Sequence, residues 1–121
     1  MDDAIRDALA SDRTVDLTTT GRRSGAPRRL EIWMHQVDGA TYITGTPGRR
    51  DWYANVLADP RVVLHLKESA SADLPATAEP LTDPDERARV LDVILARVGR
   101  GAQRDRWLSD SPLIALRFDD A

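Results

Sequence analysis

Two short turns rich in glycine and arginine carry the residues whose chemistry is easiest to recognise in this sequence. The first turn, residues 21–27, reads Gly-Arg-Arg-Ser-Gly-Ala-Pro and is followed directly by Arg28. Backbone N–H groups, a serine hydroxyl and forked guanidinium groups suit a phosphate or carboxylate, because one arginine can bind two oxygens at once. We therefore predict an anion site here, built from Arg22, Arg23, Ser24, Gly25 and Arg28.

The second turn, residues 45–50, contains Thr46 and ends in Arg49 and Arg50. Asp51 follows and is expected to cap a short helix, whose N-terminus adds free N–H groups and a partial positive charge. If the two turns meet at one end of a sheet, both would serve one anionic group. The alternative is that both are charged loop tips that only face solvent.

Aromatic and polar side chains near these turns could accompany a ring-shaped ligand. Trp52 could form a wall for a flat ring with the Asn55 amide nearby, or it could simply anchor its helix to the sheet. Glu31, Trp33 and His35 share one face of a strand, which predicts a substrate groove or a subunit interface. His35 could also act as a general acid, since an unperturbed imidazole titrates near neutral pH.

Charge and composition narrow the classes of ligand. The net charge is −3, yet six arginines fall between residues 20 and 50, and acidic residues outnumber basic ones eleven to seven from residue 68 onward. A local arginine patch on a slightly acidic protein favours a small anionic ligand over a nucleic acid. The sequence has no cysteine, its two histidines stand at no metal-ligand spacing, and no apolar run approaches the ~20 residues of a membrane span. We expect no metal site, and an acidic N-terminus without an apolar core predicts a cytoplasmic protein.

Periodicity and turn signals define the elements that must position these residues. Residues 13–20, 28–37, 41–46, 61–66 and 113–118 are expected to be strands, with an edge strand interrupted by prolines within 72–81. An Asp-Gly pair at 38–39 predicts a tight hairpin. Helices are expected over 3–9, from 51 to just before Pro60, from Asp83 to Gly99 and over 102–108. Residues 1–121 should form a single domain, mainly β with flanking helices (α+β), as a six-stranded antiparallel barrel.

The motif from the first turn to the later aromatic helix is familiar. LTTTGRRSGAPRR, a hairpin, and then GTPGRRDWYANVLADPRVVLHLK resembles the deazaflavin-dependent nitroreductase family of the flavin/deazaflavin oxidoreductases. The likeness covers residues 14–67, and it implies a split β-barrel related to pyridoxamine-phosphate oxidase, binding a flavin or deazaflavin.

The resemblance also implies a cofactor and a reaction. In those relatives the cofactor is coenzyme F420; carried over by motif, Arg23, Ser24, Gly25 and Arg28 would hold its phosphate, with Trp52 and Asn55 beside the ring or its ribityl chain. Hydride transfer to a quinone, enone or nitro compound is then expected, and split barrels of this kind often form homodimers. Two other readings stay open: an FMN-dependent oxidoreductase and a non-enzymatic carrier using the same groove.

Two departures from the nitroreductases bear on the substrate. The loop before the Trp-Tyr pair is shorter here and lacks the lysine of the relatives, so that Arg49 and Arg50 would have to replace its phosphate contact. The nitroreductases also place tyrosines late in the chain near the acceptor, whereas this sequence has no tyrosine after Tyr53. We therefore expect a different acceptor pocket.

Overall fold

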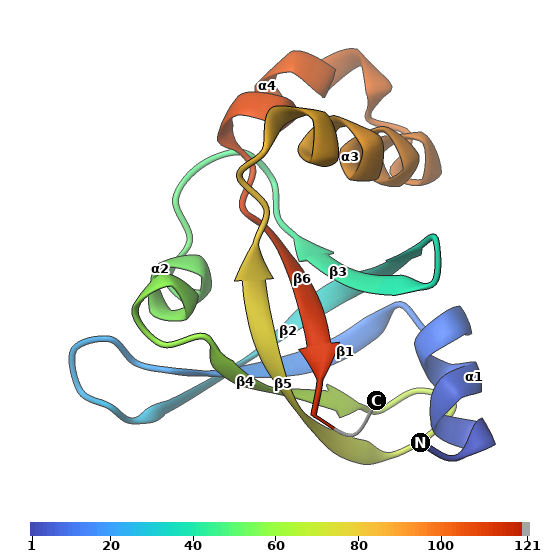
Figure 1. Ribbon diagram of the computed structural model, residues 1–121, viewed down its shortest axis with the longest axis vertical. Coiled ribbons are helices and arrows are strands. Elements are labelled where there is room, and N and C mark those ends of the chain that lie inside the picture. The colour runs from blue at the N-terminus through green and yellow to red at the C-terminus, as the bar shows by residue number, and fades with distance from the viewer. Residues whose placement is uncertain (120–121) are drawn as a thin grey trace.

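The computed structural model describes residues 1–119, which fold into a closed barrel of six antiparallel strands with flanking helices (Figure 1). The strands are β1 Thr14–Thr20, β2 Pro27–Val37, β3 Ala40–Thr44, β4 Arg61–Leu66, β5 Ala72–Pro80 and β6 Leu113–Phe118. The helices are α1 Asp3–Ser11, α2 Asp51–Ala58, α3 Pro84–Val98, the 3-10 turn η1 Gly101–Gln103 and α4 Arg104–Asp110. The predicted six-stranded α+β architecture is thereby confirmed. No helix among residues 1–119 is long and apolar enough to cross a membrane.

The strand order around the barrel is β1-β2-β3-β6-β5-β4, and every neighbouring pair is antiparallel. The tight β2–β3 connection is the predicted hairpin: Asp38 and Gly39 have φ angles of 53° and 80°, as a two-residue turn of this hand requires. Pairing of β1 with β4, in which Leu17 stands opposite Leu64, closes the barrel.

The barrel interior is filled by alternate residues of each strand. In β1, Val15, Leu17 and Thr19 are buried while the residues between them are partly exposed, which is the period-2 pattern of a strand with one face in a core. Met34 and Ile43, neighbours across the β2–β3 ladder, join the same core cluster. This rigid interior fixes where the loops at each end of the barrel lie.

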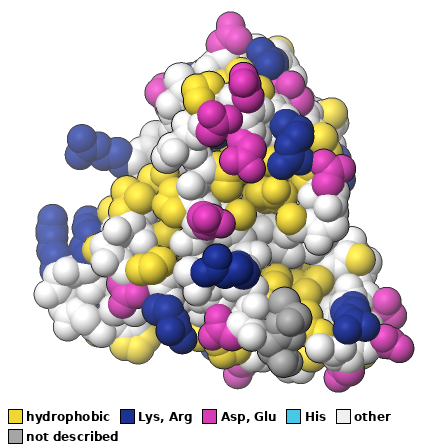
Figure 2. All heavy atoms as spheres, viewed as in Figure 1, with side chains coloured by type: hydrophobic (Ala, Val, Ile, Leu, Met, Phe, Trp, Pro, Cys, Tyr) yellow, Lys and Arg dark blue, Asp and Glu magenta, His cyan; other side chains and the backbone are white. Residues whose placement is uncertain are grey.

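A second apolar cluster lies between the barrel and the helical layer of α3 and α4. Figure 1 shows these two helices together beyond one end of the barrel, and Figure 2 shows hydrophobic side chains where the layer meets it. Val37 from the barrel, Leu91 from α3 and Trp107 from α4 all belong to this cluster. The α3 helix begins as predicted, with the Asp83 side chain accepting a hydrogen bond from the Glu86 N–H at 3.0 Å, and it ends at Gly99.

The expectation that residues 72–81 form an edge strand was wrong, because β5 pairs with β4 on one side and β6 on the other. Proline is tolerated here by its position along the ladder. The carbonyl of Pro75 accepts a hydrogen bond from the Asp119 N–H at 3.1 Å, just past the end of β6. The missing N–H of Pro75 therefore lies at the end of that ladder, beyond the last pair of β5 and β6 residues, Ala76 and Phe118.

Candidate cofactor and acceptor site

The first basic turn is a compact loop stabilised by its own backbone. The N–H of Gly21 donates to the Ala26 carbonyl and the N–H of Gly25 donates to the Gly21 carbonyl, both at 2.8 Å. The Ser24 hydroxyl accepts from the Ala26 N–H at 3.2 Å. A Cβ on Gly21 would lie 3.0 Å from the Ser24 Oγ, so that a side chain there would crowd the loop. The predicted turn thus has one well-defined shape.

Asn55 fastens this turn to α2. Its Oδ1 accepts from the Arg22 backbone N–H at 3.1 Å and from the Arg22 Nη1 at 2.9 Å, and its Nδ2 donates to the Thr19 Oγ1 at 3.1 Å. Arg22 also reaches Asp51 at 3.4 Å. Asn55 is only 4% exposed, and its amide is already engaged with protein groups on both sides. In this arrangement Asn55 and Arg22 position the turn, and other side chains are left to bind a ligand.

A groove of about 490 Å³ lies between the turn and α2, which we call the turn groove. Its lining residues are Thr19, Gly21, Arg22, Arg23, Ser24, Arg28, Arg29, Leu30, Asp51, Trp52 and Asn55. Figure 2 shows Lys and Arg side chains gathered at the left edge of the molecule, the side on which Figure 1 places this turn and α2.

The arginines of the turn groove differ in what already binds them. Arg29 is paired with Asp16 at 3.0 Å and Arg22 with Asn55 and Asp51, whereas Arg23 and Arg28 make no side-chain hydrogen bond or ion pair with any other residue between 1 and 119. Two free guanidinium groups beside a serine hydroxyl are the donors that a phosphate needs. The residues present therefore fit a cofactor phosphate.

Trp52 supplies an apolar wall to the same groove. It is 6% exposed and packs edge-on against Tyr53, with ring centroids 5.9 Å apart. Trp52 also belongs to the barrel core cluster, so it anchors α2 as one of the two readings expected; that it flanks a cofactor ring stays a prediction.

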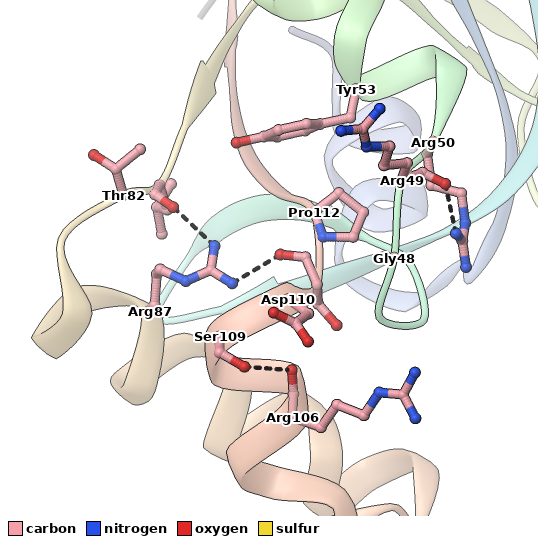
Figure 3. Close-up of a pocket in the computed structure, with 12 residues that line it drawn as sticks. Gly48, Arg49, Arg50, Tyr53, Thr82, Arg87, Arg106, Ser109, Asp110 and Pro112 are labelled. Atoms are coloured by element: carbon pink, nitrogen blue, oxygen red, sulfur yellow. Dashed lines mark hydrogen bonds between the residues drawn. The ribbon is translucent and has the colours of Figure 1, made fainter.

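The second basic turn does not join the first, contrary to the expectation that both would meet around one group. Gly48, Arg49 and Arg50 line a separate cavity of about 560 Å³, which we call the helix cavity (Figure 3). Since α2 gives Trp52 to the turn groove and Tyr53 to the helix cavity, this helix is a wall of both.

The end of the second turn also differs in detail from the prediction. Arg50, and not Asp51, is the residue that precedes α2, and no side chain caps this helix. The Arg50 guanidinium instead bonds to the Thr46 hydroxyl and, at 2.7 Å, to the Arg49 carbonyl. Thr46 is therefore placed to orient Arg50. Whether Thr46, Arg49 and Arg50 contact the cofactor stays a prediction.

Glu31, Trp33 and His35 line neither the turn groove nor the helix cavity. Trp33 is 48% exposed, with the Arg13 guanidinium 5.0 Å from its ring centroid, and Glu31 lies 3.5 Å from Lys67. The structure therefore lends no support to placing these three residues in a substrate pocket formed by either site.

His35 is buried, so its environment differs from that of the exposed residues before it. Burial, with the positive charges of Arg13 and Arg97, lowers the pKa of His35 to about 4 from its ordinary value of 6.5. The imidazole is consequently neutral at neutral pH and carries no proton to give as a general acid there.

Several contacts at or near the site were missed from sequence. The Thr19 hydroxyl and the far wall of the helix cavity, formed by Arg106, Ser109 and Asp110 of α4, carry no local motif. His65 bonds to both Thr18 and Asp73 at 2.7 Å, although the sequence shows only three separate strand residues. Such pairings depend on strand register, which a single sequence does not display.

The described residues form a closed six-stranded antiparallel barrel with a basic turn groove beside a short aromatic helix, which is the architecture that the resemblance implied. Residues 5–114 match the model of the F420H(2)-dependent quinone reductase family, and the chain therefore belongs to that family. The predicted relationship is confirmed: the protein is an F420-dependent reductase, and its cofactor is coenzyme F420.

Solved structures agree on the fold. A conserved hypothetical protein from Mycobacterium tuberculosis, Rv2991, has 21% identity over 98% of this chain and 81% of its own, with a TM-score of 0.76. An F420-H2 dependent reductase, FDR-A, has 22% identity over 88% of this chain and 95% of its own, with a TM-score of 0.67. A structure described as a domain-swapped dimer has 23% identity over 88% and 81% of the two chains, with a TM-score of 0.67.

Proposed function

We propose that this F420-dependent reductase holds the cofactor phosphate in the turn groove, through Arg23, Ser24, Gly25 and Arg28, and uses it to reduce a quinone. The observation that carries the proposal is the pair of free guanidinium groups, Arg23 and Arg28, on a turn whose shape is fixed by its own hydrogen bonds and by Asn55. A prearranged set of donors binds an anion without first having to be ordered.

The remaining predicted contacts are arranged around this group. Trp52 would flank the ring or its ribityl chain, and Asn55 would act by holding the turn. Arg49 and Arg50, on the other side of the first turn of α2, would attract the acidic tail by charge.

Bound reduced F420 would supply the hydride; with a proton from solvent, a quinone is then reduced by two electrons to the hydroquinone while F420 is oxidised. The part left to the chain is to position the cofactor and to exclude competing reactions. Enone and nitro acceptors are chemically equivalent hydride acceptors, and the same assay can compare them.

The first test is a titration of the purified apo-protein with oxidised F420 and, in parallel, with FMN, read by quenching of tryptophan fluorescence. We expect micromolar F420 binding with much weaker FMN binding, followed by quinone-dependent oxidation of reduced F420. Tighter binding of FMN than of F420 would instead assign FMN as the cofactor. Binding of F420 without turnover of any acceptor would favour the carrier role.

Two variants test the phosphate contacts directly. Arg23→Ala and Arg28→Ala should each weaken F420 binding by roughly 1.5–3 kcal/mol, the range for a hydrogen bond to a charged group. Arg100→Ala, an exposed arginine in the connection after α3, removes the same charge elsewhere and should leave affinity unchanged. Wild-type affinity in both turn variants would refute the phosphate site.

We further propose a cytoplasmic homodimer. The support for the dimer is the domain-swapped dimer among the structural neighbours, together with the exposed Trp33 beside Arg13 on the outer face of the barrel. Light scattering on the wild type and on Trp33→Ser would test this: we expect a dimer that the substitution converts to a monomer. Cell fractionation would test the location.

A further inference from the structure

Three side chains on the outer face of the barrel form a hydrogen-bonded chain that the reductase function does not use. The Thr18 Oγ1 lies 2.7 Å from the His65 Nε2, and the His65 Nδ1 lies 2.7 Å from the Asp73 Oδ1. A hydroxyl, an imidazole and a carboxylate linked in this order are the groups with which hydrolases activate a nucleophile. Such a set is recognised by its geometry, because the order of the three residues along the chain differs between unrelated folds.

Three adjacent strands position these groups. β1, β4 and β5 are neighbours in the barrel, and His65 stands directly opposite Asp73 in the β4–β5 ladder. Thr18 stands opposite Val63 in the β1–β4 ladder, which makes it the diagonal neighbour of His65 on the same face of the sheet. Since the barrel ladders hold the backbone at all three positions, the spacing of the side chains does not depend on a loop.

The hydrogen-bond chain has one consistent set of donors when the imidazole is neutral. A carboxylate only accepts, so the ring proton must be on Nδ1, and Nε2 then accepts from the Thr18 hydroxyl. The hydrogen bond from His65, together with the positive charge of Arg29, lowers the pKa of Asp73, so Asp73 is a carboxylate at neutral pH. His65 is 9% exposed, and its ring is held at both nitrogens. The hydroxyl therefore points its proton at a base, as general base catalysis requires.

Arg29 brings a positive charge to the same face. It stands directly opposite Thr18 in the β1–β2 ladder, and its Nε donates to the Asp16 Oδ2 at 3.0 Å. Its two Nη groups make no hydrogen bond with the side chains or backbone of residues 1–119. Asp16 also accepts from Lys67 at 2.7 Å, so its charge is already shared between two cations. Free N–H donors beside a nucleophile can stabilise the negative charge that develops when an ester carbonyl is attacked.

A depression of about 230 Å³ lies beside Thr18 on this face, and we call it the outer depression. Val63 and Pro75 give it apolar walls, and Thr20 also lines it. Its volume is below the range of drug-sized ligand sites, so it suits a short acyl group and not a large substrate. Trp33, the proposed dimer contact, stands opposite Thr14 at the other end of β1.

We propose that Thr18, His65 and Arg29 form a second active site, which hydrolyses small esters with a short acyl group. The Thr18 Oγ1 attacks the ester carbonyl while its proton passes to the His65 Nε2, and Arg29 stabilises the oxyanion that forms. The bond to the alcohol then breaks, the alcohol leaves with the proton from His65, and the acyl group stays on Thr18. Water, deprotonated by His65, attacks this acyl-threonine, which releases the carboxylic acid and restores the hydroxyl.

Asp73 is a positioning residue in this scheme, because it touches the imidazole and not the ester. It holds the ring in the tautomer whose Nε2 can take a proton. The reaction needs only water as co-reactant, so it is independent of F420 and of the proposed reductase function.

The test uses the full chain without F420, with p-nitrophenyl acetate as the probe and release of p-nitrophenol as the readout. We expect hydrolysis above the buffer rate, saturation with ester, and an acetyl group on Thr18 in peptide mass spectra after a rapid acid quench. Thr18→Val keeps the β-branched shape and should lower kcat by roughly tenfold or more. Thr20→Val changes a threonine on the same strand that also lines the outer depression, and as the matched control it should keep the wild-type rate.

Two further variants separate the base from the residue that positions it. His65→Gln should lower kcat as strongly as Thr18→Val and remove the rise of the rate with pH, since a histidine base must first lose its own proton. Asp73→Asn can hold the ring in the opposite tautomer, so kcat should fall by roughly fivefold or more while KM changes less than about twofold. Urea unfolding of each variant checks that the fold is retained, and F420 titrations should match those of the wild type.

Three results would overturn the proposal. Hydrolysis of the ester at the buffer rate by the wild type would leave the three side chains as a cross-strand hydrogen-bond chain only. A wild-type rate in folded Thr18→Val would show that this hydroxyl is not the nucleophile. Acetylation found on Lys67 or the N-terminal amine, with none on Thr18, would assign the hydrolysis to those amines.

Discussion

Replacing Asn55 by alanine should loosen the first basic turn and destabilise the whole domain. The Thr19 hydroxyl, 1% exposed, would lose the donor that reaches it at 3.1 Å, and the Arg22 N–H would lose its acceptor at 3.1 Å. A neutral hydrogen bond contributes about 1 kcal/mol, and a buried polar group left unpaired costs about 1–3 kcal/mol. The guanidinium bond adds little, because the Arg22 side chain is 32% exposed to water.

These terms give an expected loss of about 2–3 kcal/mol for Asn55→Ala. With a urea m-value of about 1.5 kcal/mol/M, the midpoint of unfolding should fall by roughly 1.3–2 M at an unchanged m-value. Tryptophan fluorescence is a suitable probe, since Trp52 lies one turn before Asn55 and is buried. F420 affinity should fall as well, because the turn that holds Arg23 and Arg28 is no longer prearranged.

Two further variants serve as controls for this prediction. Asn55→Asp retains both acceptor bonds from Arg22 and can accept a bond from Thr19, so it should be less destabilising than alanine. Leu57→Ala, on the same helix but 60% exposed, should change stability by less than about 0.5 kcal/mol. An Asn55→Ala protein with wild-type stability and wild-type F420 affinity would refute the role of Asn55 as the clamp of the turn.

Three further predictions concern the rest of the fold. The folded-state pKa of His35 is lowered to about 4, so on acidification the imidazole is protonated in the unfolded chain before it is protonated in the folded protein. The free energy of unfolding should therefore fall as the pH decreases from 6.5 toward 4, by at most about 3 kcal/mol. Urea titrations at several pH values should show this slope in the wild type and a flatter one in His35→Gln. Arg87→Ala removes a donor from four carbonyls, of which only that of Trp107 has a second printed donor, the Ser111 N–H, so Tm in a thermal scan should fall by roughly 6–12 °C; a fall below 2 °C would argue against this role. Gly39→Ala places a side chain at φ 80° and should cost about 1–2 kcal/mol, whereas Gly101→Ala, with open space around it, should cost little by the same measurement.

Local signals were enough to predict most of the elements. Alternation along residues 13–20 and 61–66, the Asp-Gly hairpin and the Asp-Pro start of the long helix are all short-range patterns, and the strands and helices lie where these patterns put them. The edge assignment of β5 failed because prolines are a local feature, whereas barrel closure depends on β6, which lies more than 30 residues later in the chain.

The candidate site shows the same division between local and long-range information. The first turn could be predicted from its own residues, and Trp52 with Asn55 from the motif that follows. The hydrogen bonds that the Asn55 amide makes could not be predicted, because its partners Arg22 and Thr19 are 33 and 36 residues away in the sequence. Charge alone also could not reveal that the two basic turns face different cavities, since both are adjacent to the same helix.

The position of β6 in the barrel has a consequence for how the protein is made. Residues 113–118 pair with β3, some 70 residues earlier, and with β5, so neither of those strands has its second neighbour until this segment leaves the ribosome. Until then a nascent chain exposes two unpaired strand edges, the surfaces most prone to intermolecular pairing. Folding of the barrel is therefore completed after synthesis of residue 118, and substitutions that slow the docking of β6 should reduce soluble yield more than they reduce the stability of the finished protein.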